Sequence, residues 1–492
     1  MSVWPKYPTI YEINTWAWLS EQSKQSNTSV DLSCVNASVW DGIATLGFDA
    51  VWLMGVWERS PAGTAIANQN GSLLEDFRRA LPDFRPDDNV GSPYCVRRYC
   101  ADPHLGGCDG LATARQELAK RGIRLILDFV PNHVAPDHPW VNRHPEYFIH
   151  GSIEEARNAP AAFIESGGHV FARGRDPYFP PWPDVLQLNA FHPGLRQAMI
   201  QTLSSIASQC DAVRCDMAML MLNPIFERTW GSRAGQPPPE DYWRAIIPAV
   251  KELHTDFLFI AEAYWDLEWE LQQQGFDLCY DKRLYDRLEH ENAESVRLHL
   301  SADTKYQDKL LRFIENHDEQ RAAAVFSHEK HRAAAVTIAT LPGARLFHEG
   351  QIEGRKTKVP VFLDRRPYEH ADEVLVNFYQ GLLKTTARPA FHEGEWTLCE
   401  RFGWPDNRTY QNLLAWTWLK GSERYLVIVN LSEGAAQGRI PLTWGGMQGA
   451  WWRLSDVLSP AVYDRNGDEL FSAGLYIDLG PWCYHLFQCC RI

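Results

Sequence analysis

The chain has 492 residues, of which 45% are hydrophobic and 22% charged, a balance that excludes a disordered chain, a collagen-like fibre and a small disulfide scaffold. Its 48 basic and 62 acidic residues give a formal net charge of −14, so a nucleic-acid partner is not expected. No window approaches about 18 unbroken apolar residues, so we predict no membrane span. The opening MSVWPKYPTI has one Lys and no apolar core, so no signal peptide is expected.

The 11 cysteines are odd in number and form no C-x-x-C pair. We interpret them as buried free thiols in a reducing compartment, which favours a cytoplasmic protein. One group could in principle hold zinc, but its spacing fits no established zinc pattern, and the sequence predicts no metal site. That group comprises Cys95, Cys100, His104 and Cys108.

Eight short apolar runs recur along the first 350 residues, separated by polar residues and by segments of helical period. They show little alternation of apolar and polar residues, as is typical of parallel strands covered on both faces. The runs are Thr9–Asn14, Ala50–Met54, Arg124–Phe129, Ala212–Asp216, Phe257–Ala261, Phe276–Tyr280, Leu310–Glu315 and Ala344–Phe347.

Helical spacing lies between the runs, in Leu111–Arg121, Leu195–Ser208, Asp241–Leu253 and Lys330–Ala339. Eight strands that alternate with helices predict an α/β fold, the (β/α)₈ barrel. We assign the barrel to residues 1–133 and 212–392.

Two regions break the alternation. Residues 134–211 are rich in Pro, His and aromatic residues, and segments such as DPYFPPWPDV cannot be helical, so we predict an inserted subdomain over the barrel mouth. After about residue 390 the apolar residues alternate with period 2, as in RYLVIVNL and LYIDL. This pattern predicts a C-terminal antiparallel β-sandwich over residues 393–492. Its many Trp residues could pack on the barrel or bind sugar rings.

Polar residues stand where several of the predicted strands end. Barrel enzymes build their active sites at the carboxyl ends of the strands, so these side chains are expected to converge on one rim. The residues are Asp128, Asn132 and His133 after the third run, Arg214 and Asp216 at the end of the fourth, Glu262 after the fifth, and His317 and Asp318 after the seventh.

A pair of carboxylates flanking an anomeric carbon is the minimum for glycoside hydrolysis. Arg214 beside Asp216 would keep that carboxylate ionised, as a nucleophile requires. The apolar flanks of Glu262 (FLFIAEAYW) would raise the pKa of its carboxyl, as a general acid requires.

These strand ends resemble a known family. Four segments are similar, in chain order, to the signature regions of the α-amylase family of retaining glycoside hydrolases, glycoside hydrolase family 13. They are DFVPNH at 128–133, AVRCD at 212–216, AE at 261–262 and ENHD at 315–318. Supporting similarity lies in GFDAVWLM, GSPY, QLN and ARLFHEGQIEG, at 47–54, 91–94, 187–189 and 344–354. The resemblance covers residues 1 to about 390.

The resemblance implies a role for each matching residue. Asp216 would be the nucleophile, Glu262 the general acid/base and Asp318 the residue that stabilises the transition state. Four more residues would contact the sugar: Tyr94 by stacking on it, and His133, His317 and Arg321 by binding it. Arg214, in the same substrate-binding group, would orient Asp216. Asp128 and Asn132 would support the site.

The sequence also departs from the family. Many members carry Lys and His three and four residues after the nucleophile, where this chain has Met219 and Leu220. The pair commonly binds the leaving group, and the His position often helps to hold calcium. The sequence therefore favours a small or unusual leaving group at an apolar rim. Asn132 could be a calcium ligand in family terms, but we predict no cofactor.

The leading hypothesis is a retaining hydrolase of a small α-glucoside or oligosaccharide. The same covalent intermediate would serve a transglycosylase or phosphorylase, and DHPWVNRHPEYF at 137–148 faintly resembles the maltosyl-phosphate-using branch. An endo-acting amylase and a non-catalytic sugar-binding relative are further alternatives, although all three acids are present. The expected partner is a carbohydrate. The sequence does not define the oligomeric state.

Overall fold

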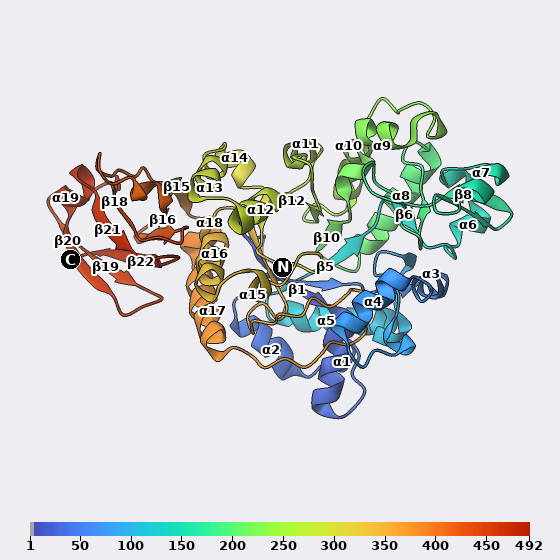
Figure 1. The fold of residues 1–492 in the computed structure, drawn as a ribbon, viewed down its shortest axis with the longest axis horizontal. Helices are drawn as coiled ribbons and strands as arrows, with labels where there is room; N and C mark the ends of the chain where they lie inside the picture. The colour runs from blue at the N-terminus through green and yellow to red at the C-terminus, as the bar shows by residue number, and fades with distance from the viewer. Residues whose placement is uncertain (1–3) are drawn as a thin grey trace.

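The computed structural model describes residues 4–492. Residues 1–3, on which part of the signal-peptide expectation falls, lie outside the described residues. Eight parallel strands close into a barrel, in which each strand pairs with its neighbour along the chain and the last pairs with the first (Figure 1). The strands are β1 (Thr9–Asn14), β2 (Ala50–Met54), β5 (Arg124–Phe129), β10 (Ala212–Cys215), β11 (Leu258–Ala261), β12 (Leu278–Tyr280), β13 (Leu310–Arg312) and β14 (Ala344–His348).

Each of the eight predicted runs is one of these strands, so the predicted (β/α)₈ barrel is confirmed. The runs lack alternation because both faces of each strand are covered. In β1, β2 and β5 every residue is buried. Side chains such as Ile10, Trp52 and Ile126 fill the barrel interior, whereas Ile13, Val51 and others pack against the surrounding helices.

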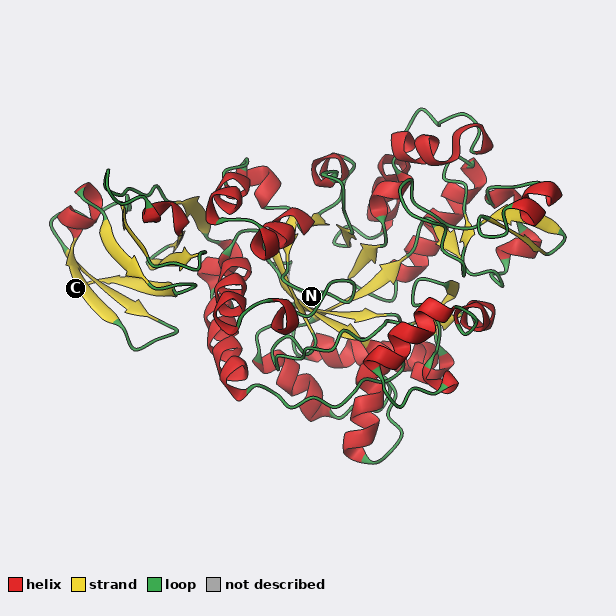
Figure 2. Cartoon of the chain, in the orientation of Figure 1, coloured by secondary structure: helices red, strands yellow, loops and turns green. Residues whose placement is uncertain are grey.

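Helices surround the barrel (Figure 2). The four predicted helices are present, with ends that differ by up to four residues, as α5 (Gly107–Lys120), α8 (Pro193–Ala207), α10 (Tyr242–Leu253) and α16 (His328–Thr340). Others are α1 (Thr15–Ser26), α2 (Ala37–Thr45), α12 (Lys282–His290), α13 (Ala293–Leu300) and α17 (Glu373–Thr386). Although α8 falls within the range assigned to the insertion, it packs against β10 and α10 and belongs to the barrel wall.

The insertion after β5 contains two small antiparallel pairs. Strand β6 (His133–Val134) pairs with β9 (Leu186–Gln187), and β7 (Phe163–Ser166) pairs with β8 (His169–Ala172). Short helices, including α6 (Trp140–Arg143) and α7 (Ile153–Asn158), complete it. A second excursion, which the sequence did not reveal, lies between β2 and α5 and contains β3 (Trp57–Arg59), α3 (Pro61–Ala67), α4 (Gly71–Ala80) and β4 (Val96–Ala101).

The C-terminal part is antiparallel, as predicted. A six-stranded sheet has the order β15-β16-β17-β22-β19-β20, and β18 pairs with β21 in a two-stranded sheet. An apolar cluster that includes Leu426, Trp452 and Ile477 lies between the two sheets. Figure 1 places these sheets at the opposite end of the molecule from the insertion. The strands are β15 (Glu395–Leu398), β16 (Leu413–Lys420), β17 (Glu423–Asn430), β18 (Ala436–Ile440), β19 (Trp451–Asp456), β20 (Val462–Asn466), β21 (Leu475–Leu479) and β22 (Tyr484–Arg491).

All eleven cysteines are free, but only six are buried. The interpretation as buried thiols is therefore wrong for the other five, which are exposed: Cys34, Cys100, Cys108, Cys483 and Cys490. Within residues 4–492 no helix has the length and apolar character needed to cross a bilayer.

Candidate active site

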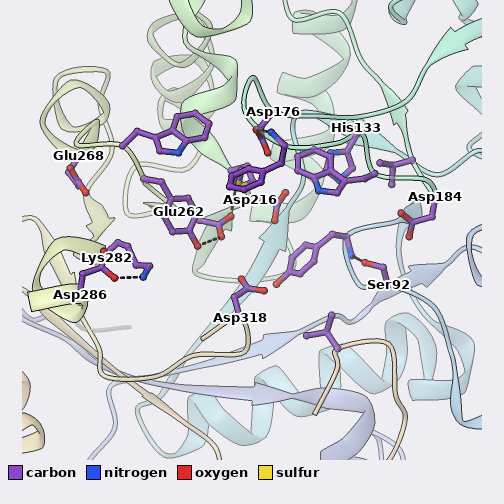
Figure 3. Close-up of a pocket in the computed structure, with 18 of the residues that line it drawn as sticks. Ser92, His133, Asp176, Asp184, Asp216, Glu262, Glu268, Lys282, Asp286 and Asp318 are labelled. Carbon is purple, nitrogen blue, oxygen red and sulfur yellow. Dashed lines mark hydrogen bonds and ion pairs between the residues drawn. The ribbon is translucent and has the colours of Figure 1, made fainter. Parts of the chain in front are cut away.

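A cavity of about 770 Å³ opens at the carboxyl ends of the barrel strands. Asp216 follows β10, Glu262 follows β11 and Asp318 follows β13, and all three line this cavity. Figure 3 shows the three carboxylates around a common space, with Lys282 on one side and His133 on the other. The structure thus brings together the three acids that the strand ends had indicated.

Arg214, on β10, joins two of the three acids. Its Nη1 lies 2.8 Å from Oδ1 of Asp216, and its Nη2 lies 2.7 Å from Oε2 of Glu262. The guanidinium is buried and lies 5.1 Å from the ring centre of Tyr94. A planar fork that reaches two carboxylates fixes their separation. Arg214 therefore lies beneath the cavity and positions both acids.

Glu262 has the environment of a general acid. Burial raises the pKa of its carboxyl to about 7, and the positive charge of Arg214 opposes this rise only in part. Its Oε2 accepts a 2.6 Å hydrogen bond from the backbone N–H of Met217, and its Oε1 accepts one of 3.0 Å from the hydroxyl of Tyr264. Near neutral pH a large share of Glu262 therefore keeps its proton.

Burial also raises the pKa of Asp216, even though Arg214 donates a hydrogen bond to it. The expectation that Arg214 alone keeps this carboxylate ionised is thus too simple. Desolvation in the substrate-free cavity outweighs the guanidinium, and the negative charges of Asp318 and Asp128 act in the same direction as burial.

Asp318 belongs to a second charged group. Its Oδ2 lies 2.9 Å from Nε2 of His317, whose Nδ1 is hydrogen-bonded to the carboxylate of Glu12 in β1. The hydroxyl of Tyr94 also approaches Nε2 of His317, at 2.5 Å. Burial alone would lower the pKa of His317, but the charges of Asp318 and Glu12 raise it well above its usual value.

The pKa of Asp318 follows from the same contacts. Burial acts to raise it, but the charge of His317 outweighs burial and lowers the pKa below its usual range. Asp318 therefore stays negatively charged as the pH falls through the value near 7 at which Glu262 takes up its proton. Glu12 is fully buried and had not been singled out, although an acidic residue inside a buried strand was a visible signal.

Asp128 and Asn132 lie below the cavity. Oδ2 of Asp128 accepts a 3.2 Å hydrogen bond from the backbone N–H of Gly55, and its Oδ1 lies 3.8 Å from Nη1 of Arg214. Asn132 exchanges side-chain hydrogen bonds with Gln187 of β9, at 3.2 and 2.9 Å. Asn132 thereby ties the end of β5 to the insertion.

His133 and Tyr94 line the cavity together with residues of the insertion. The ring of His133 lies 5.1 Å from that of Trp182, and burial lowers the pKa of His133 to about 3. His133 is therefore neutral near pH 7. It can accept or donate a hydrogen bond to a sugar hydroxyl without adding charge.

Arg321 does not lie where the sequence placed it. Its Nη1 binds Oε1 of Glu315 at 2.6 Å, Nδ1 of His348 at 2.8 Å and the carbonyl of Glu349 at 2.8 Å. The side chain is buried and does not line the cavity. Because the guanidinium is already hydrogen-bonded to these buried groups, the structure gives no support to the expected sugar contact.

Met219 and Leu220 do not form an apolar rim. They lie in a short 3₁₀ turn, Ala218–Met221, and both are buried away from the cavity. Their positions relative to the nucleophile follow from the sequence, but the orientation of their side chains does not. The side of the cavity next to Glu262 is instead lined by Met217, Tyr264 and Trp265.

Trp265 and Asp266 extend this side through an unusual turn after β11. Both residues have positive φ, 63° and 60°, a conformation that non-glycine residues rarely adopt. The turn places Trp265 on the cavity wall, where its ring lies 4.8 Å from that of Tyr178. Trp182 and Trp265 lie in two segments that the sequence analysis had singled out, DPYFPPWPDV and FLFIAEAYW, but nothing in the sequence shows which rings reach the cavity.

Charged side chains line the same side. Lys282 lies 2.5 Å from Asp286, and Arg283 pairs with Asp266. Across residues 4–492 no three His, Cys, Asp or Glu side chains are arranged to hold a metal ion. In the Cys95 group, Cys95 is buried and its thiol donates to the carbonyl of Asp184, whereas Cys100 and Cys108 are exposed.

Comparison with known proteins defines the family. The sequence model described as alpha amylase, catalytic domain, matches residues 24–391. This match spans most of the chain and includes all the strand-end residues described above. The chain belongs to the α-amylase family, as its motifs had indicated.

Individual relatives are distant. The chain is 24% identical over 389 residues to an alpha-amylase, MalA, of Haloarcula japonica, an alignment that covers 77% of this chain and 48% of that protein. It is 29% identical over 231 residues to an alpha-1,4-glucan:maltose-1-phosphate maltosyltransferase of Bifidobacterium longum, covering 45% of this chain and 24% of the relative. The chain thus spans about half the length, or less, of these two relatives.

Among solved structures, an alpha-amylase of Geobacillus thermoleovorans complexed with acarbose has the same fold. It superimposes with a TM-score of 0.69 at 16% identity, over 100% of this chain and 99% of the other. The confirmed fold class thus extends through the C-terminal domain.

Proposed function

We propose that the chain is a retaining hydrolase of α-glucosidic bonds that acts through a covalent glycosyl-enzyme. The observation that carries the proposal is the Arg214 bridge between Asp216 and Glu262, at 2.8 and 2.7 Å, on the floor of the cavity. One guanidinium that reaches both carboxylates favours the short separation, about 5–5.5 Å, of retaining enzymes over the wider one that leaves room for a water.

In the first step, Glu262 donates its proton to the glycosidic oxygen as the bond to the anomeric carbon breaks. Oδ2 of Asp216, the oxygen not bonded to Arg214 Nη1, attacks the anomeric carbon and forms the glycosyl ester. Asp318, negatively charged beside His317, stabilises the positive charge that develops on the sugar ring.

In the second step, ionised Glu262 removes a proton from a water molecule. The resulting hydroxide attacks the anomeric carbon, the bond to Asp216 breaks, and Glu262 is again protonated. Arg214 assists in both steps because its positive charge stabilises whichever carboxylate is ionised. The backbone N–H of Met217 serves the same purpose for Glu262.

The size of the cavity favours an oligosaccharide as substrate. Its volume of about 770 Å³ is typical of small-molecule sites. A second cavity of about 500 Å³ adjoins it, since Asp318, Val361 and Phe362 line both. We place the leaving group beside Tyr264 and Trp265, next to the acid, and the rest of the substrate toward the second cavity.

A glycosyl transfer is the second candidate. The similarity to a maltosyltransferase over 231 residues supports it, and Lys282 and Arg283 line the side of the cavity next to Glu262, where an acceptor other than water would bind. An endo-acting amylase remains an alternative within the hydrolases.

A product screen tests the proposal. The protein is incubated with starch, maltooligosaccharides and small α-glucosides, with and without phosphate, and the anomer formed first is followed by NMR. We expect free sugar in the α configuration. Release of β-anomer would contradict retention, and a sugar phosphate or a new glycoside in place of free sugar would assign the chain to the transferases.

Variants test the residue roles in the same assay. Glu262→Gln should lower turnover by about 10²–10⁴-fold because proton transfer is lost. Asp216→Asn should abolish the covalent intermediate. Glu252→Gln is the matched control, since Glu252 is an exposed residue of α10 that does not line the cavity. Equal activity of Glu262→Gln and Glu252→Gln would contradict the assignment.

A further inference from the structure

The outward face of the two-stranded β18–β21 sheet carries an unusual group of aromatic side chains. Phe402 is 55% exposed and Tyr476 is 47% exposed. The ring of Trp404, half-buried, lies 6.0 Å from that of Tyr476 and is inclined to it by 64°. We call these three residues the aromatic platform. A group of exposed aromatic side chains contributes little to the stability of the fold, and such patches commonly mark a binding surface.

Strand register places the platform on one face. Phe402 lies opposite Arg439 of β18, and Arg439 lies opposite Tyr476 of β21. Residues directly opposite one another point to the same side of a sheet, so Phe402, Arg439 and Tyr476 form a row across adjacent strands. Trp404 joins this row through the contact of its ring with Tyr476. Neighbouring strands lie about 4.8 Å apart, so the Cα atoms of Phe402 and Tyr476 are separated by roughly 10 Å.

The opposite face of this sheet is a normal core. Ala436, Ile440, Leu475, Ile477 and Leu479 are all buried in the cluster between the C-terminal sheets. Buried and outward-facing side chains therefore alternate along β18 and β21. The aromatic residues of the platform lie on the outward face, where an antiparallel sheet normally carries polar residues.

Hydrogen-bonding groups lie in the next row of the same face. Gln437 donates to Oδ2 of Asp478 at 3.0 Å, and Asn407 donates to Oε1 of Gln437 at 3.1 Å. Carboxamide and carboxylate groups both bind hydroxyls. A sugar ring presents an apolar C–H face and a rim of hydroxyls, so aromatic rings beside a polar row match its two kinds of surface.

We propose that this face binds an α-glucan chain, as a site separate from the catalytic cavity. The polar row and the charged Arg439 between the rings fit a hydroxylated ligand better than a protein partner, which favours a continuous apolar centre. Figure 1 places β18 and β21 in the C-terminal end of the molecule, away from the insertion that borders the cavity. The site would hold a glucan chain while the cavity acts on it.

Adsorption to starch granules tests this proposal. Granules present glucan chains on a surface that an exposed platform reaches more readily than a cavity does. We would measure adsorption isotherms of the full chain carrying Glu262→Gln, so that digestion does not interfere. In that background Phe402→Ala with Tyr476→Ala should raise the dissociation constant by roughly tenfold, since two stacking rings are lost.

The control variant is Trp451→Ala with Phe471→Ala, which removes two exposed aromatic side chains of the same domain outside the platform. It should adsorb as its parent does. Because the readout is binding, its outcome is independent of whether the cavity hydrolyses or transfers glucose units.

Two outcomes would overturn the proposal. One is equal adsorption of the platform variant and its parent. The other is a parent protein that self-associates in light scattering while the platform variant does not, which would assign the face to self-association. The variant should fold normally, since both rings are exposed, and an unchanged unfolding midpoint checks this.

Discussion

Glu12 illustrates how a buried residue far along the chain from the acids can act on them. It contacts His317, and His317 contacts Asp318, so a carboxylate of the first barrel strand and one after the seventh share a single cation. Oε2 of Glu12 has no hydrogen-bond partner. A buried carboxylate with an unpaired oxygen lowers the stability of the fold unless its charge interacts favourably with a neighbouring group. We infer that the negative charge of Glu12 serves to keep His317 protonated.

This arrangement makes a pH-dependent prediction. In Glu12→Gln, the pKa of His317 should fall, because one of the two charges that raise it is gone. His317 then loses its proton at a lower pH, and Asp318 loses its cation. We expect kcat/KM to fall by roughly 10- to 100-fold, with the deficit growing as pH rises. Steady-state kinetics across pH measure this effect.

The conservative variant Glu12→Asp serves as the control and should recover part of the activity. The side chains that bind the ring nitrogens of His317 in the wild type are Glu12, Asp318 and Tyr94. A deficit of equal size at every pH would show that Glu12 acts through packing alone.

Glu262 sets the alkaline limit of activity. Its pKa of about 7 means that the acid form is lost as the pH rises through that value, so kcat/KM should fall there. The hydroxyl of Tyr264 donates to Glu262 and favours the ionised form. Tyr264→Phe should therefore move the alkaline limb to higher pH, which a pH profile measures. A shift to lower pH would be contrary to this account.

At this scale the sequence predicted which residues converge but not how they are oriented. Asp216, Glu262 and Asp318 could be identified because strand ends of a barrel share one rim. Arg321 and Met219 could not be placed, because a position in a loop does not say whether a side chain faces the cavity. Arg321 is held by Glu315, and Met219 turns into the core.

The elements of the barrel were predictable from local patterns, since a strand covered on both faces leaves an unbroken apolar run. Three C-terminal strands, β15, β20 and β22, were not predicted from the sequence. The residues of β20, VYDRN, are half-buried or exposed, and β22, YHLFQCCR, mixes polar residues into its apolar pattern. The partners of β22, which are β17 and β19, lie elsewhere in the chain, and this information is absent from a local window. Strand β20 pairs with β19 directly before it, but its own residues carry no apolar pattern.

A tight turn between α16 and β14 gives a prediction at the scale of elements. Gly343 has φ of +91°, and a Cβ there would lie 2.2 Å from the carbonyl oxygen of Leu310 in β13. Displacing the backbone of a neighbouring barrel strand would cost free energy of folding. Gly343→Ala should destabilise the protein by at least about 1–3 kcal/mol, measured by chemical denaturation.

The same substitution at Gly42 is the matched control. Gly42 lies in α2, is exposed, and has no atom within 4 Å of an added Cβ. Alanine favours a helix over glycine, so Gly42→Ala should stabilise the protein by about 0.5–1 kcal/mol. Effects of the same sign at both positions would show that the clash at Gly343 is relieved.

On the scale of the whole molecule, the barrel and the C-terminal sheets share one apolar core. Trp416, Trp418 and Val427 of the C-terminal sheet belong to the same buried cluster as the barrel helices. The indole N–H of Trp418 donates to the carbonyl of Thr340 in α16 at 2.7 Å. Arg297 of α13 also binds the carbonyl of Cys399, at 2.8 Å. Packing on the barrel thus accounts for part of the high Trp content.

This shared core predicts that the two parts unfold together. Calorimetry of the full chain should show one transition, because separating the parts would expose the surface around Trp418. Trp418→Ala should destabilise the whole molecule by about 3–5 kcal/mol, since a fully buried indole is lost. Trp451→Ala, at an exposed position of the same sheet, should change stability by about 0.5 kcal/mol or less. Two resolved transitions, of which Trp418→Ala moves only one, would show that the C-terminal domain is stable independently of the barrel.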